Sequence, residues 1–448
     1  MLRVAVVGSG PSGCYTAQSL VRLDSEVCVD VLDRLPCPYG LVRYGVAPDH
    51  EKIKSLQNQL RAVLEHDRVR FLGGVRIGPD GVSVARLRRL YHAVVYCVGA
   101  ATDRHLGIPG EDLPGSWSAT QFVSWYSAHP DAADAGFLRD ARSAVVIGLG
   151  NVAVDVTRML ARGPAELTPT DMPQGALAAL GASRVTEIHM VGRRGPSQAR
   201  FTTKELRELG TLPDTDVVVD PAELALDPGY ADPSALPAPQ RRNVEVLRDW
   251  ADSSRTGAPR RIHLRFFLRP AELLAGQGRV RGARFERTAP DSHGGVRGTG
   301  HHEVVEGQLV LRSVGYRGVP LEDLPFDPVT GTVPNLCGRV LREGAASPGE
   351  YVAGWIKRGP TGVIGTNRPC AKETATSLLE DAPALALRVV PDDPLPLLHA
   401  EGVHPIEWEG WRSIERAEAD LGAALGRGVV KLPDWQSLLE AAAGRAPH

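Results

Sequence analysis

The sequence lacks the cysteine patterns of zinc, iron–sulfur and dithiol proteins. Its six cysteines form no Cys-x-x-Cys and no clustered spacing, so we expect neither a metal site nor dithiol–disulfide chemistry. Cys14, Cys28 and Cys97 stand in apolar helix or strand patterns, where a cysteine behaves as a small hydrophobic residue. Reduced thiols of this kind favour a cytoplasmic protein.

Long apolar runs and an excess of charge are also lacking. No apolar run approaches the ~18 residues that are needed to span a bilayer, so no membrane span is expected. The first strand pattern begins within a few residues of Met1, so we expect no signal peptide. The net charge of −2 gives no whole-chain attraction to nucleic acid, and any basic surface for a partner must be local.

The pattern that organises the chain is an apolar run at residues 4–7 that opens into Gly8-Ser-Gly10-Pro-Ser-Gly13. In such a turn the first glycine makes the bend, the second lets backbone amides approach a pyrophosphate, and the third lets helix and strand pack closely. A helical apolar pattern follows, and the N-terminus of a helix offers unpaired N–H groups to phosphates. We therefore predict a dinucleotide site here.

A second strand pattern at residues 27–32 ends in Asp33, twenty positions after the last glycine of the turn. A carboxylate at that place is expected to accept hydrogen bonds from a ribose. Residues 35–50 are too apolar for a solvent linker and too rich in proline and glycine for a helix, which favours a loop across a bound ligand.

The remaining patterns indicate alternating strands and helices. Residues 281–307 are polar and unpatterned, which indicates a surface hairpin or loop, and residues 163–183 form a Pro/Gly-rich excursion. A proline-rich segment after residue 391 leads to a helical tail over residues 408–442. Further predicted elements are a helix over 51–65 and strands over 69–71, 75–77, 93–98, 187–191, 309–314 and 351–355.

The first design is repeated at residues 144–153, where a strand pattern opens into Gly148-Leu-Gly-Asn-Val-Ala. Two such turns indicate two doubly wound domains that hold two dinucleotides. The strand pattern at 187–191 ends in Gly192-Arg193-Arg194 and not in an acid. Arginines at this place match the 2′-phosphate of NADP, although they are also compatible with solvated surface charges.

Several longer motifs together resemble adrenodoxin reductase and its bacterial relatives, the NADPH–ferredoxin reductases, from the N-terminus to about residue 380. They are the two glycine turns, Tyr39-Gly-Leu-Val-Arg-Tyr-Gly-Val-Ala-Pro-Asp-His50, Val191-Gly-Arg-Arg-Gly-Pro and Gly354-Trp-Ile-Lys-Arg-Gly-Pro-Thr-Gly-Val-Ile364. The resemblance implies an α/β protein with two doubly wound (Rossmann-like) domains, one for FAD and one for NADP. The expected division is 1–104 and 319–448 for FAD, the latter including the tail, and 105–318 for NADP. Electrons would pass from NADPH through FAD to a ferredoxin, an acidic iron–sulfur protein.

The resemblance also implies contact residues. Asp33 replaces the usual glutamate and shortens the reach to ribose, and Leu149 replaces a usually polar residue. Without the resemblance, Glu205 would be a helix-surface acid. The expected FAD contacts are Gly8, Gly10, Ser12, Gly13, Asp33, Leu41, Ile77, Trp355, Gly362, Val363 and Ile364. The expected NADP contacts are Gly148, Leu149, Gly150, Asn151, Val152, Arg193, Arg194 and Glu205, with Gly362 as a further candidate.

Some roles stay open at this stage. His50 and Asp155 form a candidate proton-transfer pair near the flavin, or His50 only makes loop hydrogen bonds. The arginines between residues 241 and 269 form either a basic face for ferredoxin or a solvated surface. Other functions compatible with the sequence are a two-electron NADPH oxidoreductase acting on a quinone or another small acceptor, and a flavin-bound redox sensor.

Overall fold

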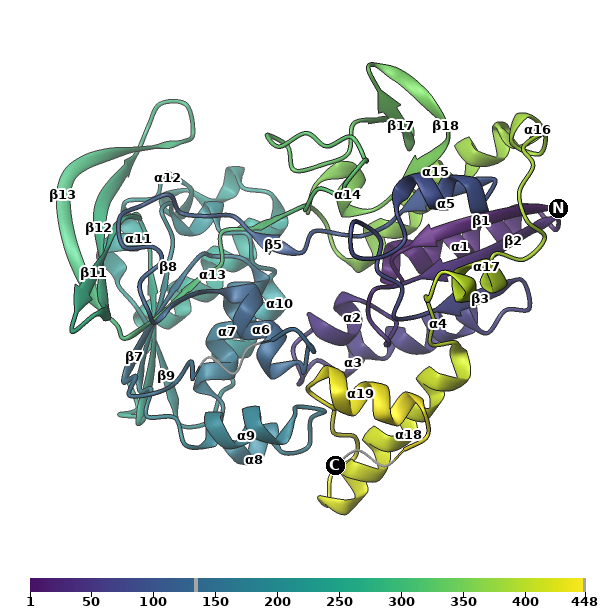
Figure 1. Cartoon of the computed structure of the whole chain (residues 1–448). Coiled ribbons are helices and arrows are strands. Elements are labelled where there is room, and N and C mark those ends of the chain that lie inside the picture. The colour runs from purple at the N-terminus through teal and green to yellow at the C-terminus, as the bar shows by residue number, and fades with distance from the viewer. Residues whose placement is uncertain (133–135, 446–448) are drawn as a thin grey trace. The chain divides into compact units, whose positions relative to one another are not determined.

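The computed structural model describes residues 1–132 and 136–445, which divide into two compact units (Figure 1). Unit 1 comprises Met1–Thr102, Ser127–Asp131 and Tyr316–His448, and unit 2 comprises Asp103–Tyr126 and Ala132–Gly315. The chain therefore leaves unit 1 after Thr102, contributes the short segment Ser127–Asp131 to it, and returns to it at Tyr316.

Unit 1 is built on a seven-stranded sheet in which β18, β4, β1, β2 and β3 run parallel and β17 and β16 add an antiparallel edge. Across the sheet the strands are β16 (Asn335–Leu336), β17 (Arg339–Arg342), β18 (Ala345–Val352), β4 (Ala93–Tyr96), β1 (Leu2–Val7), β2 (Val27–Leu32) and β3 (Val69–Leu72).

Alternate residues of β1 face opposite sides of this sheet, as the period of a strand requires. Val4 and Val6 join the core beneath α1 and α15, whereas Ala5 and Val7 join the core beneath α5. The helices of unit 1 are α1 (Pro11–Leu23), α2 (Leu41–Tyr44), α3 (Glu51–Lys54), α4 (Leu56–Leu64), α5 (Val84–Leu90), α14 (Trp355–Arg358), η3 (Ile364–Thr366), α15 (Asn367–Glu380), α16 (Ala382–Leu385), α17 (Leu395–Ala400), α18 (Trp408–Ala424) and α19 (Trp435–Ala442).

Unit 2 has a six-stranded sheet whose strands are all parallel, and a three-stranded antiparallel sheet. The parallel strands are, across the sheet, β6 (Ser116–Ser118), β14 (Leu309–Arg312), β7 (Ser143–Ile147), β8 (Glu187–Val191), β10 (Arg260–Arg265) and β9 (Thr215–Val219). The antiparallel strands are β11 (Leu268–Gly276), β12 (Arg279–Pro290) and β13 (Val296–Glu306). A two-stranded ladder pairs β5 (Thr102–Asp103) with β15 (Tyr316–Arg317).

The two faces of the parallel sheet of unit 2 have different covers. Val146 and Met190 point into a large core with the helices, whereas Val145 and Val191 pack with residues of the antiparallel sheet. The helices of unit 2 are α6 (Ala119–Tyr126), α7 (Asn151–Ala161), α8 (Pro164–Leu167), α9 (Gln174–Gly181), η1 (Pro196–Gln198), α10 (Thr203–Leu209), α11 (Pro221–Ala225), α12 (Pro228–Ala231), η2 (Pro233–Ala235) and α13 (Ala238–Asp252). Among the described residues no helix is long and apolar enough to cross a membrane.

Several local predictions are wrong. Residues 75–77 form no strand, and Ile77 makes only an isolated bridge to Val82. The loop over 35–50 contains one helical turn, α2, because its four residues lie between glycines that let the chain enter and leave. The expected helix over 51–65 is two helices, α3 and α4. By contrast, the hairpin predicted as one alternative for residues 281–307 is confirmed, because β12 and β13 pair there.

One further prediction extends an element too far. The strand expected over 351–355 ends at Val352, because Gly354 has a φ of +79° and turns the chain into α14 at Trp355. The predicted helical tail over 408–442 consists of two helices, α18 and α19, and Gly426 adopts a φ of +67° between them. The excursion over 163–183 contains the helices α8 and α9.

Two candidate dinucleotide sites

The glycine turn of unit 1 joins β1 to α1. Gly8 has a φ of +107°, and a Cβ there would lie 2.6 Å from the carbonyl oxygen of Cys97. A Cβ on Gly13 would collide with the carbonyl oxygen of Gly8. The chain itself therefore requires these two glycines, since they allow β1, α1 and the end of β4 to approach closely.

Gly10 differs from its two neighbours because the surrounding chain leaves room for a side chain. Its φ is −69°, and a Cβ there would lie 3.7 Å from the Cα of Gly40, which is an ordinary contact. Gly10 is the N-cap residue of α1 and no side chain caps that helix, so its first N–H groups face outward without a side-chain partner. The buried hydroxyl of Ser12 also has no hydrogen-bond partner among the described residues. An open turn with these donors fits an anionic pyrophosphate.

Asp33 follows β2, and the turn itself holds its carboxylate. Oδ2 accepts hydrogen bonds from the N–H and hydroxyl of Ser9 at 2.8 and 2.5 Å, and Oδ1 accepts from the N–H of Leu35 at 2.9 Å. Burial raises the pKa of Asp33 above its usual value, although these donors oppose the shift. Ser9 is a site residue that the sequence reasoning missed, since it occupies a variable position between the glycines.

The loop after Asp33 forms the second wall of this turn. The N–H of Tyr39 donates to the carbonyl of Ser9 at 3.1 Å, and Tyr39 adopts a φ of +82°. A Cβ on Gly40 would lie 2.9 Å from the Cα of Gly10, so the two backbones are in close contact. Leu41 begins α2 and exposes 37% of its surface, which leaves its side chain available to a ligand.

The turn between β18 and α14 also lies against α1. A Cβ on Gly354 would collide with the side chain of Ser12. The half-buried indole of Trp355 donates to the carbonyl of Thr361 at 3.2 Å, and its ring centroid lies 5.4 Å from that of Tyr316. Trp355 is therefore held by the carbonyl of Thr361 and the ring of Tyr316, one position after the glycine that meets Ser12.

The segment before α15 presents backbone in a fixed conformation. Gly362 has a φ of +79°, and the N–H of Val363 donates to the hydroxyl of Thr366 at 3.1 Å. Val363 is 65% exposed and Ile364 is half-buried. Ile77 is half-buried against the core beneath α5. Because helix N-termini favour negative charge, the start of α15 fits the electron-rich edge of a flavin.

The C-terminal helices hold the loop that carries Leu41, a contact that the sequence did not predict. Arg43 donates to both carboxylate oxygens of Glu418 in α18, at 3.1 and 2.6 Å, and both side chains are buried. Glu418 also accepts from the N–H of Leu432 at 3.0 Å, and the ammonium of Lys431 donates to the carbonyl of Arg43 at 2.6 Å. The Arg43 guanidinium lies 5.0 Å from the ring of Trp411. We call these five residues the tail clamp.

The glycine turn of unit 2 repeats the same geometry between β7 and α7. Gly148 has a φ of +146°, and a Cβ there would collide with the carbonyl oxygen of Ser313. Gly150, the N-cap residue of α7, has no side-chain cap, and a Cβ there would meet nothing within 4 Å. The side-chain oxygen of Asn151 accepts from the N–H of Thr202 at 2.8 Å and so joins α7 to the start of α10.

Leu149 packs over the end of β8. It stands at a position where the motif that this chain resembles usually has a polar residue. A Cβ on Gly192 would collide with the Leu149 side chain, so the leucine depends on a glycine at that place. The carbonyl of Leu149 accepts from the N–H of Phe201 at 3.1 Å, and Val152 packs on the main core of unit 2. Leu149 therefore supplies packing, while the backbone of the turn stays open.

Arg193 and Arg194 follow β8, where the sequence placed the adenosine ribose. Their carbonyls are fixed by the Thr288 hydroxyl at 2.8 Å and by the N–H of Phe267 at 3.3 Å. Arg193 is exposed and Arg194 half-buried, and within the described part of the chain neither forms an ion pair with an acid. Two unneutralised guanidinium groups on a fixed backbone fit a doubly charged phosphate.

Asp155 and Glu205 meet at one buried cation. The fully buried Arg158 lies 2.8 Å from Asp155, 3.2 Å from Glu208 and 3.8 Å from Glu205, and so links α7 to α10. Glu205 is therefore buried in a charge cluster and does not lie free on the helix surface. His50 is buried in unit 1 and Asp155 belongs to unit 2; their proton-transfer role stays a prediction.

Two α/β units that each carry a strand–glycine–helix turn define a protein with two dinucleotide-binding domains. Residues 2–210 match the family model described as pyridine nucleotide-disulphide oxidoreductase. The mitochondrial NADPH:adrenodoxin oxidoreductase of Arabidopsis thaliana is 39% identical, over 99% of this chain and 95% of that protein. The NADPH-ferredoxin reductase FprA of Mycobacterium tuberculosis (strain ATCC 25618 / H37Rv) is 43% identical, over 98% of this chain and 99% of its own.

The solved structures agree with these relatives. The structure of M. tuberculosis FprA in complex with NADPH superimposes with a TM-score of 0.93 at 43% identity, over 99% of this chain and 100% of that one. The chain belongs to the family of adrenodoxin reductase and the FprA-type NADPH–ferredoxin reductases. The fold class expected from the sequence, two Rossmann-like α/β domains, is confirmed.

Proposed function

We propose that this chain is a FAD-dependent, NADPH-specific oxidoreductase that delivers electrons singly to a ferredoxin-type iron–sulfur protein. The observation that carries the proposal is the pair of glycine turns, one in each unit. Gly10 and Gly150 both stand where the surrounding chain would accept a Cβ, and both begin helices with no side-chain cap. Space that the chain leaves open at two such turns is explained by two bound pyrophosphates.

In unit 1, FAD would lie across α1 with its pyrophosphate at Gly10 and Ser12. The loop through Tyr39 and Gly40 would cover it, and the tail clamp would hold that loop. Asp33 would share its carboxylate between the turn and a ribose hydroxyl. Further proposed contacts are Gly8, Gly13, Leu41, Ile77, Trp355, Gly362, Val363 and Ile364.

In unit 2, NADPH would lie with its pyrophosphate at the start of α7 and its 2′-phosphate at Arg193 and Arg194. Leu149 and Val152 would contribute apolar support, and Asn151 would fix the start of the neighbouring helix α10. Other proposed contacts are Gly148, Gly150 and Glu205, with Gly362 as a candidate from unit 1.

When bound, FAD would supply the chemistry by which a hydride, which carries two electrons, is passed on as single electrons. The residues of the chain bind and orient the two dinucleotides. We infer that His50 and Asp155 hold or move a proton during this exchange. Arg158, which lies 2.8 Å from Asp155, would fix the orientation of that carboxylate.

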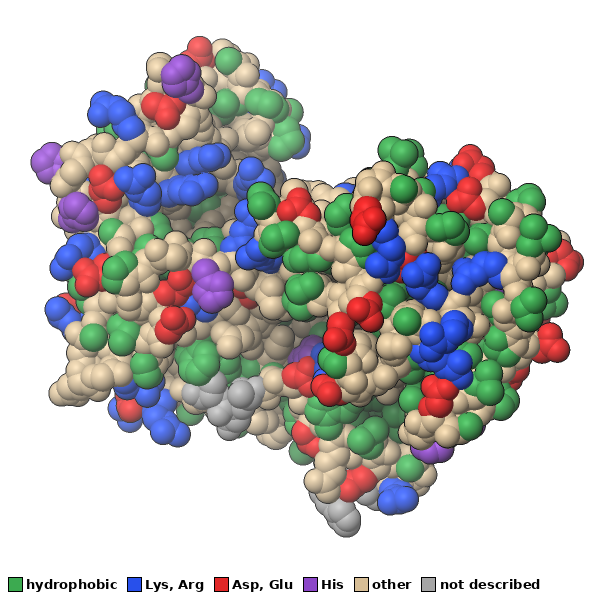
Figure 2. Space-filling view, turned by 45° about the horizontal axis from the view of Figure 1, so that its top comes forward, with side chains coloured by type: hydrophobic (Ala, Val, Ile, Leu, Met, Phe, Trp, Pro, Cys, Tyr) green, Lys and Arg blue, Asp and Glu red, His purple; other side chains and the backbone are tan. Residues whose placement is uncertain are grey.

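The proposed partner is an acidic ferredoxin, and the structure narrows which arginines can attract it. Arg261 and Arg269 each pair with a glutamate within unit 2, which neutralises much of their field. Arg241 and Arg242 in α13 are exposed, and no acid pairs with them in the described residues. Figure 2 shows Lys and Arg interleaved with Asp and Glu on the visible face, so a docking surface must be local. We propose a cytoplasmic location, which fits six free cysteines.

Matched glycine variants test the two binding sites separately. Gly10→Ala should fold but lose FAD, whereas Gly150→Ala should keep FAD and raise the KM for NADPH, because each Cβ enters only the pyrophosphate space. Flavin content by absorbance and NADPH kinetics would be measured on both. A full complement of FAD in Gly10→Ala would contradict the FAD site, and unchanged NADPH kinetics in Gly150→Ala would contradict the NADP site.

The acceptor is tested by NADPH-driven reduction of a panel of ferredoxins and quinones. Stopped-flow absorbance should show that NADPH reduces the flavin and that a ferredoxin then reoxidises it in one-electron steps. Faster turnover with a quinone than with every ferredoxin would favour the two-electron oxidoreductase. FAD binding without sustained turnover would favour a redox sensor.

A further inference from the structure

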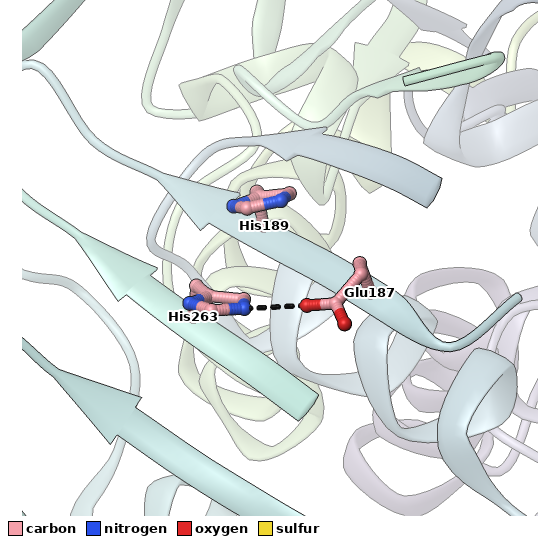
Figure 3. Close-up of side chains that lie close together, drawn as sticks. All are labelled: Glu187, His189 and His263. Atoms are coloured by element: carbon pink, nitrogen blue, oxygen red, sulfur yellow. Dashed lines mark hydrogen bonds and ion pairs between the residues drawn. The ribbon is translucent and has the colours of Figure 1, made fainter. Parts of the chain in front are cut away.

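Two histidines and a glutamate lie together on one face of the parallel sheet of unit 2 (Figure 3). Glu187 and His189 are two positions apart on β8, so their side chains share a face. His263 on β10 is the direct register partner of His189. No short motif joins these residues, so they could not be predicted as a group from the sequence.

The three side chains are arranged with ligand atoms close together. One potential ligand atom from each lies within 4.8 Å of the others. The rings of His189 and His263 stack with centroids 4.5 Å apart and an interplanar angle of 15°. Nε2 of His263 lies 2.7 Å from Oε2 of Glu187, which Figure 3 marks with a dashed line. Nδ1 of His189 is buried and has no hydrogen-bond partner among the described residues.

The two carboxylate oxygens of Glu187 have different neighbours. Arg261 binds Oε1 of Glu187, with Nε at 2.8 Å, so Oε2 faces His263. Arg265 is engaged by Glu223 and Glu303, at 2.8 and 2.6 Å. These two arginines are the cations nearest to the cluster along β10, and carboxylates pair with both.

On the strands that flank β8 and β10, the residues in register with the two histidines are apolar. They are Val145 of β7, opposite His189, and Val218 of β9, opposite His263. Val145 belongs to the core that the antiparallel sheet covers, so the histidines lie on that face of the sheet. Glu187 begins β8, whereas Arg193 and Arg194 follow its other end. The cluster is therefore separate from the residues proposed to bind NADPH.

We propose that Glu187, His189 and His263 bind one Zn²⁺ ion, with a water as the fourth ligand. On binding, the two stacked rings turn so that an in-plane nitrogen lone pair of each faces the ion, which replaces the contact between Nε2 of His263 and Oε2 of Glu187. Zn²⁺ prefers a tetrahedral set of imidazole nitrogen and carboxylate oxygen, and three protein ligands leave the fourth position to solvent. The side chains of His263 and Glu187 are 21% and 26% exposed, so an ion can reach the cluster from solvent. Arg261 holds Oε1 of Glu187 and so directs Oε2 toward the site, but it also places a positive charge beside the ion.

The test uses the FAD-loaded protein, treated with EDTA and then desalted, and Zn²⁺ alone as the probe. Isothermal titration should show one saturable Zn²⁺ site per chain. His189→Gln and His263→Gln should each weaken it at least about tenfold, because even losing an outer-shell partner costs about 10–100-fold. Arg261→Gln should strengthen binding, since it removes the adjacent positive charge. Mg²⁺ should not compete, because it prefers oxygen ligands.

His404→Gln is the matched control, because His399 and His404 form another close pair, with ring centroids 5.4 Å apart but in unit 1. This variant should bind Zn²⁺ as the wild type does. Flavin content and melting temperature in EDTA would show that each variant folds. Equal affinity in the wild type, His189→Gln and His263→Gln, or no saturable binding at all, would overturn the proposal.

A second measurement does not depend on any variant. Zinc X-ray absorption on the wild-type protein with one equivalent of Zn²⁺ should show two imidazole ligands and no sulfur. A spectrum with sulfur ligands, or without imidazole scattering, would place the ion elsewhere and overturn the proposal. A cysteine-bound ion is the most direct competitor, since the chain has six free cysteines.

Discussion

Changing Glu418 to glutamine should weaken unit 1 and loosen its hold on FAD. The substitution keeps the shape of the side chain and its acceptor for the N–H of Leu432, but it removes the charge that faces Arg43. Arg43 and Glu418 expose only 3% and 2% of their surfaces, so water cannot replace the lost partner. Burial disfavours the positive charge on Arg43. The negative charge of Glu418 outweighs this effect and holds the pKa of Arg43 well above its usual value.

The magnitude follows from this burial. Removing one partner of a buried ion pair costs about 3–5 kcal/mol, because the other charge is left uncompensated. The same helix offers a matched control, since Glu415 pairs with Arg61 while their side chains stay 22% and 29% exposed. Solvent screens that pair, so Glu415→Gln should cost about 1 kcal/mol or less.

The assay is urea unfolding followed by flavin fluorescence, which reports on unit 1. Glu418→Gln should lower the midpoint clearly and raise the FAD dissociation constant, and Glu415→Gln should change neither by much. The double variant Arg43→Met/Glu418→Leu should recover much of the loss, because apolar replacement of a whole buried pair is often neutral. Equal midpoints for Glu418→Gln and Glu415→Gln would refute the reasoning.

The remaining predictions concern coenzyme choice, partner attraction and pH. Changing Arg193 and Arg194 to alanine should raise the KM for NADPH and leave that for NADH nearly unchanged; since each charge-assisted hydrogen bond contributes about 1.5–3 kcal/mol, the preference for NADPH should fall at least about a hundredfold in steady-state kinetics. The rate of ferredoxin reduction should fall as salt rises, and a rate independent of salt would exclude steering by Arg241 and its neighbours. Burial opposes ionisation of Glu350, but hydrogen bonds from Arg342 and Ser347 outweigh burial and lower the pKa of Glu350 below 4.5. The ionised carboxylate therefore stabilises the fold above about pH 4.5, and this stabilisation is lost as the pH falls through the lowered pKa. Glu350→Gln should make the melting temperature depend less on pH between pH 5 and 3, and an unchanged pH profile would contradict this.

The sequence predicted the fold where a single segment carries the information. The strand period and the three glycines define the turn from β1 to α1, and the same holds from β7 to α7. Asp33 was placed at the end of β2 because the spacing from Gly13 determines it. Arg193 and Arg194 were placed at the end of β8 by the same reasoning.

Contacts between distant segments could not be predicted from the sequence. Arg43 and Glu418 are 375 positions apart, and neither stands in a pattern that names the other. The stacking of His189 on His263 depends on the register of β8 and β10, which only the assembled sheet defines. Asp155 and Glu205 gave no sign of Arg158 as their shared partner, because the packing of α7 against α10 brings them together.

In the sheet of unit 1, neighbouring strands come from distant parts of the chain, which has a consequence for biosynthesis. β4 pairs with β1 on one side and with β18 on the other, and the whole of unit 2 is encoded between β4 and β18. During translation, one edge of β4 therefore stays unpaired until residue 352 has been synthesised, although all of unit 2 has been synthesised by then. Arg43 lacks its ion-pair partner for even longer, because Glu418 is synthesised later than β18. A premature stop before codon 418 would release a chain in which Arg43 lacks its carboxylate partner, and such a chain should be unstable and open to proteolysis.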